Sequence, residues 1–172
     1  MSAVVQIKIN YGSTPTLTDA SAGFTFGRDD SVQSGTALPK PDALGTNYSY
    51  AKTLHLHVIS GGGSTALSNR KIRLASSPET GIYMYFKNGG DSYTQATDVI
   101  YANNTTANGF VPSGWTLLST DYQTWDSTLN NATNNTKNGN YVLLAIGIAY
   151  SYIGGAGSAI SIPNIVIQYD EQ

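Results

Sequence analysis

Short segments in which apolar and polar residues alternate dominate this chain, and they limit the folds open to it. The alternation is clearest over residues 5–9, 54–58, 71–74 and 82–86. A period of two is the pattern of a strand that buries one face. We count about eight such segments and no helical pattern longer than about ten residues. The chain is therefore predicted to be all-β, an antiparallel β-sandwich of jelly-roll type or of immunoglobulin-like topology.

The C-terminal third carries the strongest strand signals. Residues 141–150 are apolar on both faces, which predicts a buried central strand. Residues 159–169 predict the last strand, and Pro163 within it indicates an edge position or a bulge. The glycines of 154–157 are expected to turn the chain between the two strands. Residues 130–140 are rich in Asn, and we expect an exposed loop there.

Other segments are less regular. Phe24 and Phe26 share one side of an extended stretch and predict a short strand. Residues 11–19 and 87–91 are expected to form turns, the second of them tight because of its Asn-Gly-Gly sequence. Residues 121–129 are compatible with one short helix.

The length and composition favour a single domain without a nucleic-acid or membrane partner. No linker or repeat divides the 172 residues, so one domain over residues 1–172 is expected. A net charge of −2 provides no basic surface for nucleic acid or for an anionic membrane. Cysteine is absent and the N-terminus shows no signal-peptide pattern. We therefore expect assembly in a reducing cytosol.

Few side chains suggest catalysis or metal binding. His55 and His57 project to one face of a strand, where they would be able to share a zinc ion. Further ligands would have to come from carboxylates such as Asp29, Asp30, Glu79 or Asp98. The favoured interpretation is that the two histidines are polar residues on a strand face that meets solvent or an interface. No serine nucleophile motif occurs, and neighbouring carboxylates in a turn are typical caps of backbone amides. We predict no catalytic residues, no metal and no cofactor.

Exposed aromatic side chains are the candidate binding residues. Tyr83 and Tyr85 share one strand face, and Tyr48 and Tyr50 have the same spacing. Tyrosine joins a large apolar ring to a polar tip and is enriched at interfaces and sugar sites. Simple cover of a sheet face is the alternative. The interface candidates are Tyr48, Tyr50, Tyr83, Tyr85, Trp115 and Trp125.

Five stretches carry a resemblance to a known class of proteins. They are residues 16–30 (TLTDASAGFTFGRDD), 47–54 (NYSYAKTL), 68–73 (SNRKIR), 80–87 (TGIYMYFK) and 165–171 (IVIQYDE). Their order resembles small uncharacterised virion structural proteins of tailed bacteriophages. The resemblance implies a component of the particle and brings no catalytic residues with it.

We therefore expect a non-enzymatic virion structural protein that is assembled in the host cytoplasm. The leading hypothesis is a capsid decoration (cement) protein that binds the major capsid protein lattice, as a homo-oligomer such as a trimer. Residues 1–10, 31–45 and 91–114 are the segments expected to make contacts. A tail, neck or baseplate component is an alternative, and a carbohydrate-binding module for host attachment is another.

Overall fold

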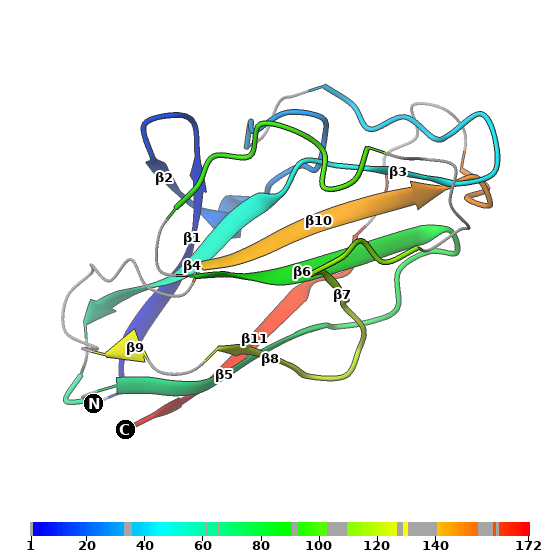
Figure 1. Ribbon diagram of the computed structural model, residues 1–172. Helices are drawn as coiled ribbons and strands as arrows, with labels where there is room; N and C mark the ends of the chain where they lie inside the picture. Colours follow the sequence, from blue (N-terminus) through cyan, green and yellow to red (C-terminus); the bar gives the residue numbers. More distant parts are fainter. Residues whose placement is uncertain are drawn as a thin grey trace.

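Two antiparallel sheets packed face to face form the molecule (Figure 1). The computed structural model describes residues 2–32, 36–60, 62–64, 66–90, 93–102, 110–126, 129–130, 141–154, 160 and 162–172. The helical element in this part of the chain is one 3-10 turn, η1 (Ala20–Ala22). None of the described segments is a helix of the length and apolar character needed to cross a membrane. The prediction of an all-β sandwich with antiparallel sheets is confirmed.

The larger sheet has the strand order β2-β1-β4-β10-β6-β7, and β3 pairs with β10 beside β4. Its central strand β10 is apolar on both faces because loops cover the outer face of this sheet. The prediction of a buried central strand over residues 141–150 is confirmed. The strands are β1 (Val4–Tyr11), β2 (Thr16–Asp19), β3 (Thr46–Tyr48), β4 (Lys52–Ser60), β6 (Ile82–Gly90), β7 (Thr116–Leu117) and β10 (Tyr141–Ala149).

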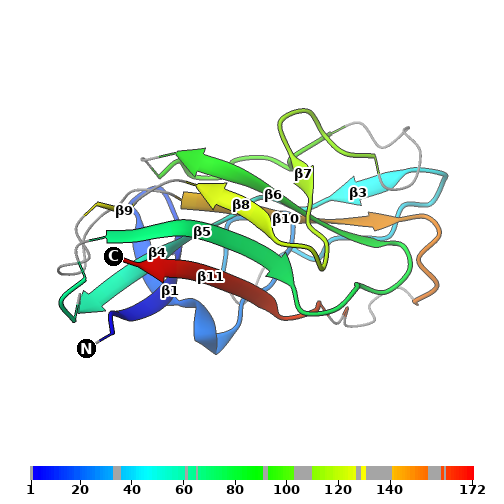
Figure 2. The same ribbon diagram turned by 90° about the horizontal axis from the view of Figure 1, so that it is seen from below.

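The smaller sheet has the order β11-β5-β8, and β9 also pairs with β5 (Figure 2). Its strands are β5 (Ala66–Leu74), β8 (Gln123–Asp126), β9 (Leu129–Asn130) and β11 (Ile165–Glu171). Strand β11 lies at the edge of this sheet, as Pro163 indicated, and begins two residues after that proline. The chain crosses between the sheets from β4 to β5 and again from β5 to β6.

Alternating side chains from both sheets meet in one apolar core. The inward positions of β4, β6 and β10 face Ile72 and Leu74 of β5 and Trp125 of β8. Burial of each such side chain contributes about 1.5–3 kcal/mol. The larger sheet supplies Leu54, Leu56, Met84, Phe86, Val142, Leu144 and Ile146.

Three of the local predictions are wrong, and in two of them strand pairing outweighed a local helix or turn signal. Residues 123–126, expected in a helix, form β8, whose Thr124 lies opposite Lys71 of β5. Part of the turn expected over 11–19 is β2, which pairs with β1. Phe24 and Phe26, expected in a strand, follow η1 as irregular chain.

The tight turn expected at residues 87–91 is also absent, since β6 continues through Gly90. Its pairing with β10 places Gly90 opposite Tyr141, with a register shift at this point. A Cβ atom on Gly89 would lie 2.9 Å from the Cβ of Tyr141. Glycine is needed here for the close approach of two strands. Of the loop expected at 130–140, Asn130 belongs to β9, and the rest lies outside the described residues, as do residues 155–157.

A buried lysine holds the segment that follows Phe26. Lys52 of β4 is 2% exposed, and its Nζ donates to the carbonyl oxygens of Asp29 at 2.8 Å and Ser31 at 2.5 Å. The Asp29 carboxylate accepts hydrogen bonds from the hydroxyl and N–H of Ser31 and from the Thr36 N–H. The Ser31 hydroxyl and the Thr36 N–H lower the pKa of Asp29 to about 2. The Asp29 carboxylate thus fixes the backbone, as is typical of a carboxylate in a turn.

Replacing Lys52 with methionine tests this network. We expect a loss of about 2 kcal/mol in the free energy of unfolding, because two buried carbonyls lose a charged donor. Urea denaturation followed by circular dichroism measures it. The matched control is Lys87→Met on an exposed position of β6, expected to change stability by less than about 0.5 kcal/mol. Equal losses in both variants would contradict the assignment.

Candidate functional site

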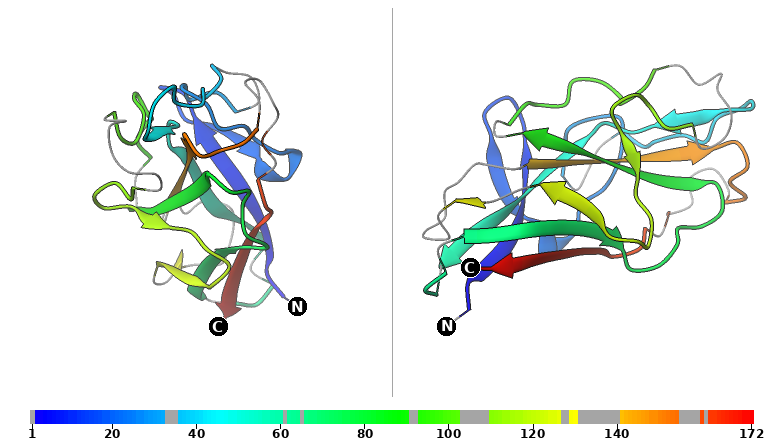
Figure 3. Two further views of the ribbon diagram at one scale, coloured as in Figure 1. Left: turned by 90° about the vertical axis from the view of Figure 1, so that its right-hand side faces the viewer. Right: turned by 60° about the horizontal axis from the view of Figure 1, so that its bottom comes forward.

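A cleft opens on the side of the sandwich where β1 and β11 run along the edges of the two sheets. Figures 2 and 3 show the two strands side by side where the termini lie, and there the Ala3 N–H donates to Glu171 Oε2 at 3.0 Å. Farther along, the sheets enclose a cleft of about 790 Å³. Its lining includes Val5, Gln6, Ile7, Asp19, Ser21, Phe24, Phe26, Leu54, Met84, Ile162, Asn164, Ile165 and Ile167.

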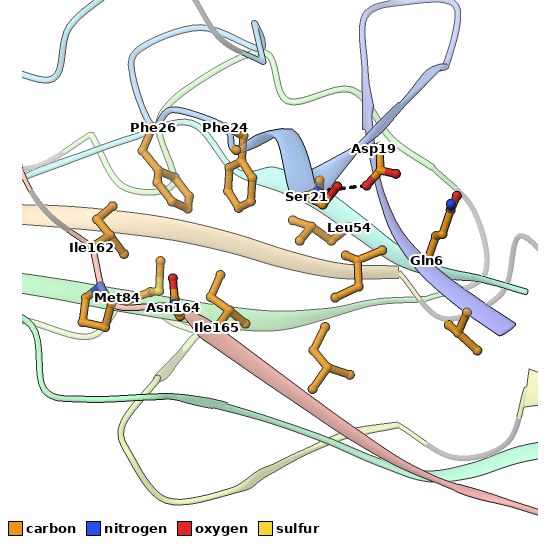
Figure 4. Close-up of a pocket in the computed structure, with 16 residues that line it drawn as sticks. Gln6, Asp19, Ser21, Phe24, Phe26, Leu54, Met84, Ile162, Asn164 and Ile165 are labelled. Atoms are coloured by element: carbon orange, nitrogen blue, oxygen red, sulfur yellow. Dashed lines mark hydrogen bonds between the residues drawn. The ribbon is translucent and has the colours of Figure 1, made fainter. Parts of the chain in front are cut away.

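The walls of the cleft come from segments far apart in the sequence (Figure 4). Phe24 and Phe26 lie on one side, with their rings edge to face at 5.3 Å. Ile162 and Ile165, at the start of β11, lie opposite. Leu54 of β4, from the core, also lines it. The η1 turn holds this wall in place, since the Gly23 N–H donates to the Ala20 carbonyl.

Most of the apolar side chains of the cleft keep part of their surface in water, although Leu54 and Met84 are buried. Core side chains of the smaller sheet, such as Ile72 and Trp125, are fully buried. Each square ångström of apolar surface that a partner removed from water would contribute roughly 25 cal/mol. A partner that covered these side chains would therefore gain binding free energy from the cleft. The partly buried members are Val5, Ile7, Phe24, Phe26, Ile162, Ile165 and Ile167.

Polar groups at the rim are few, and Asp19 among them is already engaged. Asp19 accepts a hydrogen bond from the Ser21 N–H at 2.9 Å and lies 3.9 Å from the Lys8 ammonium. The Ser21 N–H is the main cause of the lowered pKa of Asp19, which stays ionised. Among the described residues that line the cleft, Asp19 is the one ionisable side chain. A single low-pKa carboxylate is a poor general acid, so the arrangement suits binding better than proton transfer.

Two of the predicted tyrosine anchors are wrong, because the chain itself buries them. Tyr48 is 1% exposed and Tyr85 is fully buried, with ring centroids 5.7 Å apart on the outer face of the larger sheet. Both hydroxyls donate to the carbonyl oxygen of Phe110, at 2.8 and 3.1 Å. Tyr101 packs edge to face on Tyr48. The alternative interpretation, in which tyrosines simply cover a sheet face, describes this pair.

Trp125 is also removed from the candidates, because its side chain lies in the core between the sheets. It cannot present a flat ring to a sugar. Trp115, Tyr50 and Tyr83 are half-buried and keep a free surface. Their role as interface residues stays a prediction.

The histidine pair lies on the outer face of the larger sheet. The rings of His55 and His57 are 5.9 Å apart, and Lys8 of β1 is paired opposite His55. Burial, with smaller contributions from His57 and Lys8, lowers the pKa of His55 to about 4. A search of the described residues finds no group of three or more His, Asp or Glu side chains able to hold a metal ion. A neighbouring ammonium also opposes a bound cation.

The sequence interpretation missed the cleft. In the sequence, the spacing of Phe24 and Phe26 predicts a strand, and Pro163 indicates an edge. Neither signal states that the two segments face each other, because that depends on how the sheets are stacked. Comparison with protein-family models, with curated proteins and with solved structures gave no match.

Proposed function

We propose that the chain is a non-enzymatic structural protein of a bacteriophage virion, and that it decorates the assembled head. The observation that carries the proposal is the apolar cleft between the two sheet edges, whose described lining holds Asp19 as its one ionisable group. An apolar cleft with so few polar groups favours binding over catalysis. The resemblance of five sequence stretches to phage virion proteins supports the choice of partner.

The physical logic of decoration is mass action. A protein that binds the assembled lattice and not the free subunits stabilises the lattice by its binding free energy. The decorating chain then needs a folded domain with an unfilled apolar surface. The sandwich supplies the first, and the side chains around Phe24 and Ile165 supply the second.

Sedimentation of the purified protein with phage particles tests the proposal. Empty heads, filled heads and tails of the phage that encodes the chain are each mixed with it and pelleted. We expect saturable binding to heads at a fixed ratio, and greater resistance of the bound heads to heat. Binding to tails alone would replace the decoration role with a tail role. Failure to bind any particle, with specific binding on a glycan array, would overturn the proposal in favour of a carbohydrate-binding module.

A substitution in the cleft sharpens this test. Phe24→Asp places a charge in the apolar wall, and we expect head affinity to fall at least ten-fold, or about 1.4 kcal/mol. The matched control is Ile153→Asp, at a side chain 92% exposed that does not line the cleft. It is expected to bind as the unmodified chain does. Circular dichroism checks that both variants are folded. An equal loss in both, or none in Phe24→Asp, would contradict the role of the cleft.

A further inference from the structure

We propose that the cleft accepts an extended segment of another polypeptide, which adds a β-strand between β1 and β11. The segment would carry apolar side chains at alternate positions on its inward face and no charge there. This inference deepens the proposed function and rests on it for the identity of the partner. Three features of the cleft lead to it: on each side a strand edge that pairs with no described strand, and an interior that is mainly apolar.

The first edge belongs to β1. On its inner side β1 pairs with β4 along nearly its whole length. On its outer side, within the described chain, β2 pairs with it over Lys8–Tyr11. The stretch Val4–Ile7 therefore has no described strand on its outer side, and Val5, Gln6 and Ile7 line the cleft. An added strand would continue the line of β2 beyond the point where Asp19 leads into η1.

The second edge belongs to β11, which pairs with β5 on one side. The Ala75 N–H donates to the Asn164 carbonyl oxygen, so Asn164 directs its backbone toward β5. Backbone groups of successive residues alternate in direction along an antiparallel strand. The N–H and C=O groups of Ile165 and Ile167 therefore point away from β5, toward the open side. Main-chain groups of this kind bind strands by edge addition.

The interior of the cleft then fixes the side-chain pattern of the segment. Val5 and Ile7 on β1 and Ile165 and Ile167 on β11 direct their side chains to the core side. A strand between them would send every second side chain to the same side, where Phe24 and Phe26 form a wall (Figure 4). Asp19 is already matched by Lys8 and Ser21, which leaves no charge for the segment to neutralise. An uncharged, alternating segment satisfies both the edges and the interior.

A fused strand tests the inference without weakening the fold. A flexible Gly/Ser linker of about twelve residues, with a root-mean-square reach of about 20 Å, is added after Gln172 and followed by Thr-Val-Thr-Val-Thr-Val-Thr. We expect a higher midpoint of thermal unfolding. Hydrogen exchange of the backbone amides of Ile165 and Ile167, and of those in Val4–Ile7 that face outward, should slow at least about ten-fold. The matched control carries the same seven residues as Val-Val-Val-Thr-Thr-Thr-Thr.

The outcomes separate the possible occupants. Slower exchange on both edges with the alternating tail and not with the control supports strand addition. Slower exchange within a dimer that swaps tails supports it equally, with a second copy as donor. Unchanged exchange on both edges would overturn it. A second result would also overturn it: decanoate shifts the NMR signals of the Ile165 and Val5 methyl groups, while the tail protects neither edge from exchange. The cleft would then be a site for a small apolar molecule.

Head binding by the same two fusions distinguishes the failure of this inference from failure of the proposed function. The alternating tail should compete with the natural partner and reduce sedimentation with heads at least about ten-fold, whereas the control tail should leave it unchanged. If the alternating tail protected both edges but the unmodified chain did not bind heads, the decoration role would be overturned and strand addition would stand. Head binding unaffected by a tail that protects both edges would overturn the cleft as the head-binding site.

Discussion

Replacing Trp125 with alanine is expected to lower the free energy of unfolding by about 4 kcal/mol. The indole is fully buried between the sheets, and the Arg70 guanidinium lies 5.7 Å from its ring. Truncation removes the largest of the fully buried side chains and leaves a cavity that a sandwich of two stiff sheets cannot close. Urea denaturation followed by circular dichroism measures the loss.

Trp115→Ala is the matched control for this experiment. Its side chain is half-buried and lies just before β7, so we expect a loss of no more than about 1.5 kcal/mol. Similar losses in both variants would contradict the placement of Trp125. If Trp125→Ala left stability unchanged and abolished binding, Trp125 would have to lie at the surface.

The free energy of unfolding is expected to fall by about 3 kcal/mol between pH 7 and pH 4 because of His55. Burial lowers its pKa from 6.5 to about 4 in the folded chain, with His57 and Lys8 adding repulsion. Between these values the unfolded chain binds a proton that the folded chain does not, so stability falls as the pH falls. The contribution of His55 to stability is fully present above the unfolded-state pKa of 6.5, and it is lost as the pH falls through the folded-state pKa of about 4. His57 has a lowered pKa too and acts in the same direction.

The pH dependence is measured by urea denaturation at half-unit steps of pH, with two variants as controls. His55→Phe keeps an aromatic ring against Tyr141, which is 5.3 Å away, and removes the titrating group. It should abolish most of the slope between pH 7 and pH 4. His57→Gln should keep most of it. An unchanged slope in His55→Phe would show that another group causes the acid sensitivity.

The sequence predicted the features of the fold that depend on periodicity. The alternation in β1, β4 and β6 and the apolar run of β10 gave their strands and their buried faces, because each signal is local. The helix expected around Trp125 and the turn expected around Gly89 failed, because β5 and β10 pair with these segments from a distance. Pairing of that kind leaves no trace in a single window of sequence.

The candidate site was less predictable than the fold. Alternation shows that Tyr83 and Tyr85 share a face, but it does not show that Phe110 covers Tyr85 from a loop. In the same way, Phe24 and Ile165 become neighbours only through the stacking of the two sheets. Phe24 and Ile165, on opposite sides of the cleft, lie 141 positions apart in the sequence. Sequence patterns over such a distance carry no information on contact.

Hydrogen exchange of the unmodified chain, free and bound to empty heads, shows whether the heads bind at the two strand edges of the cleft. We expect binding to slow exchange in Val4–Ile7 and at Ile165 and Ile167, the two edges that flank the cleft, and to leave the exposed loop tip at Ile153 unchanged. Protection confined to that tip, with both edges exchanging as in the free chain, would contradict it.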